Sequence, residues 1–226
     1  MLKPADYYKN NSNKFGWGTD TKIPDYKINE IIPYISGKKI IDIGCGPGHL
    51  VDILSKKGFD SFGIDSVPSF IDYAKKNKKG NFQIGDANKT NFKSKEFDTV
   101  ILKSVLEHLK DDQSTLKEAL RIGKKIIVIV PQKTSSKLKK RGLIYSHYQD
   151  KSHLRNYSKR SLTKLINISG GKLIKLISIE PLPIKSIFFE LFTAPKFLKR
   201  IIIKIFFLFF KQKKYYLELL AIIKPC

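Results

Sequence analysis

The sequence predicts an α/β fold with a doubly wound, mostly parallel sheet. Three observations carry this prediction. Between residues 39 and 131, short apolar strands alternate with helical segments, and units of this length connect parallel strands through a crossover helix. The strands are nearly continuous apolar runs, such as residues 125–130, which is typical of strands buried on both faces. The length of 226 residues suits one core with additions.

The first half of the chain supplies most of these elements in order. A helix is expected over residues 24–35, ended by Gly37. The expected strands that follow are residues 39–43, 61–64, 81–84, 97–102 and 125–130, with helices at 50–57, 68–78 and 112–122 between them. Gly58 ends the first of these helices, and Pro131 closes the fifth strand.

The second half resumes the pattern after an interruption. Residues 132–157 are irregular and are expected to form a loop on the ligand side of the sheet. Beyond this loop, the expected elements are a helix over 158–169 with Ser158 as its N-cap, a strand over 173–179 and a last strand over 215–223. An apolar and basic stretch, residues 184–214, is predicted to be a helical insertion between these strands. We therefore expect an N-terminal cap and helix in residues 1–36 and one domain over residues 37–226.

Charge is the unusual feature of the composition. The chain has 43 Lys and Arg against 20 Asp and Glu, a net charge of +23, which favours a polyanionic partner or an anionic membrane surface. Because 38 of these cations are lysines, a compositional bias of the source genome is an alternative explanation. With 42% hydrophobic and 28% charged residues, the chain is globular rather than collagen-like or fully disordered.

The compartment is predicted from cysteine usage and apolar segments. Cys45 and Cys226 are too few and too oddly placed for a disulfide framework, which indicates a reducing compartment. The N-terminus does not resemble a signal peptide, and no run of about 18 apolar residues occurs. We therefore expect a cytoplasmic protein, with peripheral attachment to the inner face of the membrane as one form of it.

The segment from Asp42 to Gly48, with sequence DIGCGPG, lies directly after a buried strand and before a helix. Ligands bind beyond the carboxyl ends of the strands in such sheets, where glycines let the backbone approach them closely. A dinucleotide fingerprint needs its third glycine three residues after the second, and here the interval is two. Asp42 would also repel a phosphate, so it suits a cationic group such as the ammonium of an amino acid.

This turn, with three further segments, resembles the class I S-adenosylmethionine-dependent methyltransferases. The other segments are Asp65 after the second strand, Asp86-Ala87 after the third, and residues 104–109, with sequence SVLEHL, after the fourth. The resemblance covers residues 26–132 well and residues 154–179 less specifically. It implies a seven-stranded sheet with the last strand antiparallel, S-adenosylmethionine as cofactor and S-adenosylhomocysteine as product.

The resemblance also implies roles for individual residues in cofactor binding. The three glycines of the turn would line the methionine portion, Asp65 would accept hydrogen bonds from the ribose hydroxyls, and Asp86 would contact the adenine amino group. Asp65 lies 23 residues beyond Asp42, close to the interval of about 20 residues at which a second-strand carboxylate meets a ribose. A helix N-cap at Asp65 and a turn residue at Asp86 are the alternatives. The expected cofactor residues are Asp42, Gly44, Cys45, Gly46, Gly48, Asp65, Ser66, Asp86, Ala87, Lys103 and Ser104.

The acceptor side is predicted from histidines, because a hydroxyl acceptor benefits from a general base. His153 and His108 are the candidates for this base, and positioning without a base is the alternative. Trp17, His147, Tyr148 and Arg155 are the candidate acceptor contacts, and no metal is expected. Residues 153–158, with sequence HLRNYS, also resemble family members that methylate quinone precursors, sugars and other small hydroxylated acceptors.

Residues 196–211 are the most distinctive segment of this chain. Wound as a helix, they place Lys196, Lys199, Arg200, Lys204 and Lys211 on one side and aliphatic and aromatic side chains on the other. A basic amphipathic helix of this kind is typical of an element that lies on an anionic membrane. A helix that covers the sheet or forms a homodimer interface is the alternative.

These observations predict a methyltransferase that acts on a small or lipid-linked acceptor, at oxygen. An RNA methyltransferase is one alternative, favoured by the net charge and disfavoured because the sequence has no recognisable RNA-binding module. A cofactor-binding partner subunit without activity is the other, and the intact turn and carboxylates weigh against it.

Overall fold

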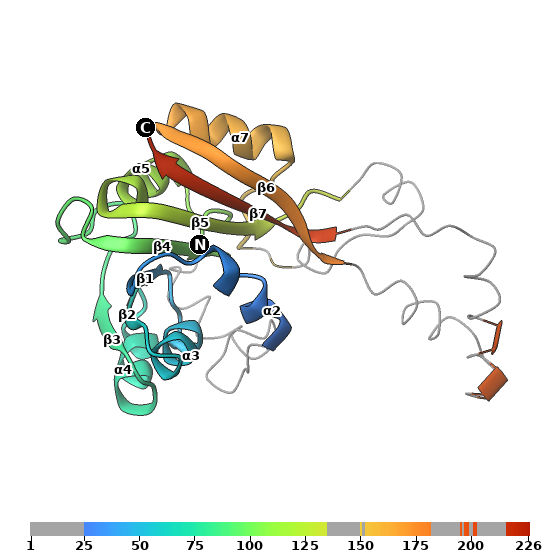
Figure 1. The fold of residues 1–226 in the computed structure, drawn as a ribbon, viewed down its shortest axis with the longest axis horizontal. Helices are drawn as coiled ribbons and strands as arrows, with labels where there is room; N and C mark the ends of the chain where they lie inside the picture. Colours follow the sequence, from blue (N-terminus) through green and yellow to red (C-terminus); the bar gives the residue numbers. More distant parts are fainter. Residues whose placement is uncertain are drawn as a thin grey trace.

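The computed structural model describes residues 25–134, 150, 152–181, 195, 197–198, 201–202 and 216–226. These residues form one sheet of seven strands in the order β3-β2-β1-β4-β5-β7-β6 (Figure 1). The strands are β1 (Lys39–Ile43), β2 (Asp60–Asp65), β3 (Asn81–Ile84), β4 (Phe97–Lys103), β5 (Gly123–Pro131), β6 (Gly171–Pro181) and β7 (Tyr216–Pro225). In this sheet β7 runs antiparallel to both of its neighbours, β5 and β6, and the other neighbouring strands pair parallel, so the described residues confirm the expected fold class.

Helices cover both faces of the sheet, as a doubly wound fold requires. They are α2 (Asp25–Asn29), the 3-10 helix η1 (Ile32–Tyr34), α3 (His49–Lys56), α4 (Pro68–Asn77), α5 (Asp112–Ile122) and α7 (Lys159–Ile168). Successive strand residues point to opposite faces. Ile41 therefore packs in the core beneath α5 and α7, whereas Ile40 packs in the second core with α2, η1 and α3.

The prediction of one helix over residues 24–35 is wrong in one respect, because the structure has two helices there, α2 and η1. Pro33 explains the division. Proline has no backbone N–H, and its ring would clash with the carbonyl four residues earlier in a continuous helix. The structure instead places Pro33 in the first turn of a new 3-10 helix, where its N–H is not needed. Ile28 and Ile31 are still buried against the sheet.

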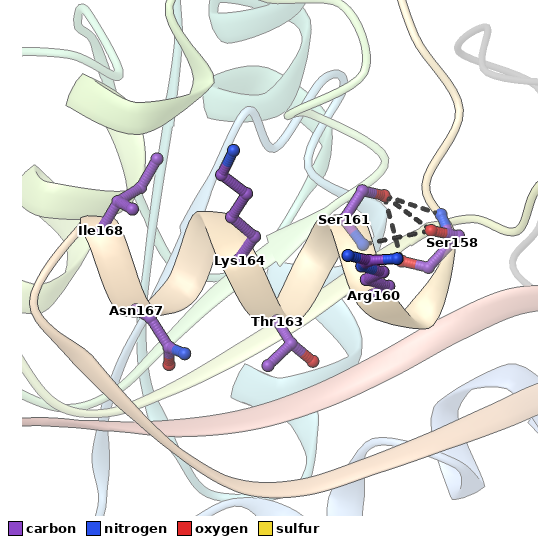
Figure 2. A pocket seen from close by; sticks show the side chains of 7 residues that line it. All are labelled: Ser158, Arg160, Ser161, Thr163, Lys164, Asn167 and Ile168. Atoms are coloured by element: carbon purple, nitrogen blue, oxygen red, sulfur yellow. Dashed lines mark hydrogen bonds between the residues drawn. The ribbon is translucent and has the colours of Figure 1, made fainter.

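The helix before β6 begins where the sequence predicts. Ser158 is the N-cap of α7, and its hydroxyl accepts from the backbone N–H of Ser161 at 3.1 Å. The Ser161 hydroxyl accepts from the backbone N–H of Ser158 at 2.9 Å, which completes a capping box (Figure 2).

Most of the segment expected to form a basic amphipathic helix lies outside the described residues. Of residues 196–211, the structure describes four, and all four are helical. They are Phe197, Leu198, Ile201 and Ile202, with exposed fractions between 38% and 67%. Among the residues that the structure describes, no helix has the length and apolar character needed to cross a bilayer.

Candidate functional site

The glycine-rich turn joins β1 to α3 and is held against β2. The backbone N–H groups of Gly44 and Cys45 both donate to the carbonyl of Ile64, at 2.8 and 2.9 Å. A Cβ added to Gly44 would lie 2.5 Å from Val105, and one added to Gly48 would lie 2.6 Å from Phe82. A Cβ on Gly46 would meet no atom of the described residues within 4 Å. Among the described residues the turn therefore packs tightly at both ends and leaves space at Gly46, where a ligand can approach the backbone.

Asp65 connects this turn to the next one. Its Oδ2 accepts from the backbone N–H of Gly46 at 2.8 Å, and its Oδ1 accepts from that of Val67 at 2.9 Å. Burial raises the pKa of the Asp65 carboxyl, against the opposing effect of these hydrogen bonds. The N-cap of α4 is Val67, so the alternative of Asp65 as a helix N-cap is wrong. Each Asp65 carboxylate oxygen can accept a second hydrogen bond, so the residue could also accept from the ribose hydroxyls. Ribose binding by Asp65 stays a prediction.

Asp42 is a buried carboxyl beside the turn, with only 4% of its surface exposed. Its pKa is raised to about 7, chiefly by burial and in part by the charge of Asp65, while Lys103 opposes both. Among the described residues, none gives Asp42 Oδ1 a hydrogen bond. A buried oxygen without a donor is costly, so the residue pattern fits a ligand that brings its own donor, as an ammonium group would. The methionine portion of S-adenosylmethionine has such a group.

The other expected cofactor residues lie at neighbouring strand ends. Asp86 follows β3, and its exposed carboxylate accepts from the backbone N–H of Asn88 at 2.8 Å, which makes it a turn residue as well. Ala87 packs against the core. Lys103 ends β4, and Ser104 follows it with φ of 55°, a left-handed conformation that is uncommon outside glycine. The carboxyl ends of β1 to β4 therefore bring the expected cofactor residues to one edge of the sheet.

His108 and His153 come together although 45 positions separate them. Their ring centroids are 4.6 Å apart, and the backbone N–H of Leu154 donates to the carbonyl of Glu107 at 2.8 Å. Ser152 links the two segments, because its hydroxyl donates to Asp150 Oδ1 at 2.6 Å and lies 2.9 Å from His108 Nδ1. A carboxylate can only accept, so the Ser152 proton points to Asp150 and His108 donates from Nδ1. The neutral His108 ring then carries its lone pair on Nε2.

Burial dominates the electrostatics of this histidine pair. The pKa of His108 is lowered to about 4, chiefly by burial and in part by the nearby His153. The neighbouring Glu107 is fully buried, and burial raises its pKa to about 8. His153 Nε2 lies 3.6 Å from Asp150 Oδ2, so the Asp150 carboxylate can stabilise a protonated His153 ring. Glu107, His108 and His153 are also the described residues that could hold a metal ion.

The glycine-rich turn and the histidine pair are neighbours. Val105 contacts the turn at Gly44 and precedes His108 by three residues. Lys103 acts electrostatically on both Asp42 and Glu107, and it lowers the pKa of each carboxyl. Val105 and Lys103 therefore link the expected cofactor residues to the segment that carries the predicted base.

Not every predicted acceptor contact is placed in this site. The guanidinium of Arg155 pairs with Asp112 at 2.7 Å and also donates to the carbonyl of Lys110 at 2.9 Å, so it ties the loop to the start of α5. Its role as an acceptor contact stays a prediction. Trp17, His147 and Tyr148 lie outside the described residues.

Three site residues escaped sequence reasoning: Glu107, Asp150 and Ser152. Glu107 directly precedes a predicted base, and the other two lie within three residues of His153. A search for carboxylates and hydroxyls beside the two histidines would have found them. Their burial and mutual contacts could not be read from the sequence, because they depend on two distant loops.

A surface hollow runs along α7 (Figure 2). Its lining consists of Ser158, Arg160, Ser161, Thr163, Lys164, Asn167 and Ile168. All of them belong to one helix and its cap, and none is a predicted site residue. The hollow therefore has no part in the site described above.

Comparisons with known proteins agree with this geometry. A family profile described as a methyltransferase domain matches residues 41–127. The demethylmenaquinone methyltransferase of Thermotoga maritima is 27% identical over 152 residues, which are 64% of this chain and 65% of that protein. The ubiquinone biosynthesis O-methyltransferase of Coxiella burnetii is 32% identical over 95 residues, which are 40% of this chain and 41% of that protein. The match thus spans less than two thirds of either relative.

Solved structures share the fold over nearly the whole chain. An S-adenosylmethionine-dependent methyltransferase from Archaeoglobus fulgidus superposes with a TM-score of 0.69 at 20% identity, covering 97% of this chain and 100% of that one. The magnesium protoporphyrin IX methyltransferase of Synechocystis, solved with bound S-adenosylhomocysteine, gives 0.62 at 16% identity over 98% of each chain. Residues 41–127 are thus similar to a methyltransferase domain, and the chain shares the fold of S-adenosylmethionine-dependent methyltransferases of known structure.

Proposed function

We propose that this protein transfers a methyl group from S-adenosylmethionine to an oxygen of a small or lipid-linked hydroxylated acceptor. The observation that carries the proposal is the adjacency of two parts of one site. Asp65 accepts from the backbone N–H of Gly46, Val105 packs at Gly44, and His108, three residues after Val105, pairs with His153. The first part suits the cofactor, and the second suits a hydroxyl that must lose its proton.

The residues of the turn would bind and orient the cofactor. Asp42 would accept from its ammonium group, Asp65 from its ribose hydroxyls and Asp86 from its adenine amino group, while Gly46 leaves room for its methionine portion. The cofactor supplies a methyl group bonded to a positively charged sulfur. On transfer, the sulfur keeps the electron pair of that bond, and the cofactor is converted to S-adenosylhomocysteine. Because this donor is already activated, the protein mainly has to align it with the acceptor and exclude water.

The acceptor hydroxyl must lose a proton as its oxygen attacks the methyl carbon. We assign that proton to His153, because Asp150 at 3.6 Å would stabilise the protonated ring. His108 is a weak base, since burial lowers its pKa to about 4. The names of the relatives, which refer to menaquinone and ubiquinone synthesis, support a quinone precursor as the acceptor class.

Residues 196–211 would attach the protein to an anionic membrane and bring it to a lipid-linked acceptor. Their basic and apolar sides support this role, as does the exposure of Phe197, Leu198, Ile201 and Ile202. Attachment to the membrane is independent of the methyl-transfer reaction and needs its own test.

The direct test is methyl transfer from radiolabelled S-adenosylmethionine to cell extract that is then separated into lipid, RNA, protein and small-molecule fractions. We expect label in the lipid or small-molecule fraction, and His153→Ala should lower its incorporation while cofactor affinity, measured by calorimetry, stays the same. Label confined to RNA would overturn the proposed acceptor class. Full turnover by His153→Ala would show that His153 is not the base, leaving His108 or no base at all.

A further inference from the structure

The histidine pair and Glu107 have the composition of a metal site, and the proposed function does not use Glu107. We propose that Glu107, His108 and His153 together bind one divalent cation of the zinc type, beside the position of the acceptor oxygen. This inference rests on the proposed function for its role but not for the binding itself. It departs from the sequence-based expectation that the protein has no metal site.

The donor geometry supports the cation. Each of the three residues offers one ligand atom, and these atoms all lie within 4.8 Å of one another. A cation with bond lengths of about 2.0–2.2 Å holds its donors roughly 3–4 Å apart, so small rotations of the side chains would complete the set. Two imidazoles and one carboxylate form a donor set that zinc accepts in catalytic sites.

Glu107 supplies an independent observation. Its exposed fraction is 0%, and neither carboxylate oxygen has a hydrogen-bond partner among the described residues. Buried polar atoms nearly always have a partner, so two such oxygens in one side chain require an explanation. A cation at this position would both neutralise the carboxylate and satisfy its oxygens.

Asp150 and Ser152 behave as supports for metal ligands. A metal-binding histidine usually donates its other ring N–H to a carboxylate, a carbonyl or water, which fixes the orientation of the ring. Here His108 Nδ1 donates to the Ser152 hydroxyl at 2.9 Å, and that hydroxyl donates to Asp150 at 2.6 Å. Nε2 of His108 is thereby set as the ligand atom. The same carboxylate lies 3.6 Å from His153 and orients the second imidazole.

Three protein ligands leave a fourth position of a tetrahedral cation open, as in catalytic rather than structural zinc sites. That position would receive the acceptor oxygen, and the positive charge would favour loss of its proton to solvent. His153 would then act as a ligand rather than as the base. Both roles explain a loss of turnover in His153→Ala, so activity alone cannot separate them.

The experiment therefore measures metal binding to the full chain. The protein is stripped with a chelator, dialysed and titrated with Zn²⁺ against a chromophoric competitor, and Co²⁺ is used as a spectroscopic probe of tetrahedral coordination. We expect one zinc ion per chain. His153→Ala and Glu107→Gln should weaken its binding by more than about 100-fold, and Ser152→Ala, which removes a support rather than a ligand, by about 10–100-fold.

His49→Ala is the matched control, because His49 begins α3 and is not among the three ligands. It should bind zinc as the wild type does. Equal zinc affinity in wild type, His153→Ala and Glu107→Gln would overturn the site, and so would the lack of stoichiometric binding to folded wild type. Thermal unfolding of each variant shows whether it folds.

Calorimetry with S-adenosylmethionine on the same stripped protein separates this inference from the proposed function. Cofactor binding without zinc binding would overturn the metal site alone. Zinc binding without cofactor binding would overturn the proposed function and leave the metal site in place.

Discussion

Asp42 shows how a single residue can favour binding at the expense of stability. Its carboxyl is buried, its pKa is about 7, and its Oδ1 receives no hydrogen bond from the described residues. Ionising such a group without a partner costs free energy in the folded chain. A ligand ammonium would recover that cost, so the residue is better suited to the bound state than to the free protein.

Asp42→Asn should therefore stabilise the free protein above neutral pH. Between about pH 4 and pH 7, Asp42 is ionised in the unfolded chain but protonated in the folded one, so its contribution to the free energy of unfolding falls as pH rises. Asparagine does not ionise, so the variant keeps its free energy of unfolding through this pH range. We expect its advantage over wild type to grow through that window to about 1–3 kcal/mol at pH 8, while its affinity for S-adenosylmethionine falls. Urea unfolding at pH 5 and pH 8 and calorimetry check both effects, and a constant difference between the two pH values would contradict the pKa argument.

Asp65→Ala should weaken S-adenosylmethionine binding by about 1–3 kcal/mol, the usual loss when buried hydrogen-bonding groups lose their partner. The change also removes the acceptor for the Gly46 and Val67 N–H groups, so the two turns lose a common anchor. Asp72→Ala, an exposed aspartate on the neighbouring helix α4, is the matched control and should leave affinity unchanged. Calorimetry on the folded proteins decides, and unchanged affinity in Asp65→Ala would remove this residue from the site.

At the scale of elements, the site divides into a part that sequence could predict and a part that it could not. The glycine-rich turn is local, because strand, turn and helix follow one another within residues 39–56. Asp65 and Asp86 were found because each lies at the carboxyl end of an expected strand. The histidine pair has no such regular spacing. It arises only because the loop before α7 returns to the loop after β4, through contacts such as Leu154 N–H to the Glu107 carbonyl.

The glycine-rich turn offers a test that separates folding from binding. Gly46→Ala should cost about 1–2 kcal/mol in stability, because φ is +53° and no described atom lies within 4 Å of the added Cβ. Gly44→Ala should cost more, since its Cβ would lie 2.5 Å from Val105 in addition to a φ of +74°. We expect Gly46→Ala to fold yet bind S-adenosylmethionine poorly, because its methyl group occupies the ligand side. Thermal unfolding and calorimetry test this, and normal affinity in Gly46→Ala would move the ligand away from the turn.

At the scale of the whole molecule, apolar strands and short connections predicted the layers of the fold, since a sheet covered on both faces needs little long-range information. Strand order is different. The insertion of β7 between β5 and β6 depends on pairing across the sheet, and here it was expected from a family resemblance rather than from the residues themselves. The division of the first helix at Pro33 was readable from the sequence and was missed.

The net charge of +23 belongs to the whole chain, and residues 196–211 test whether it serves membrane binding. Each cation near an anionic leaflet contributes about 1 kcal/mol and acts together with a buried apolar face, so attachment should be reversible and sensitive to salt. Binding to RNA would be sensitive to salt as well, so salt cannot separate the two partners. The double variant Phe206→Ser with Phe209→Ser keeps every positive charge and removes apolar surface. It should lose sedimentation with anionic liposomes and keep any affinity for RNA, whereas liposome binding at full strength would mean that this segment packs on the sheet or on a second subunit.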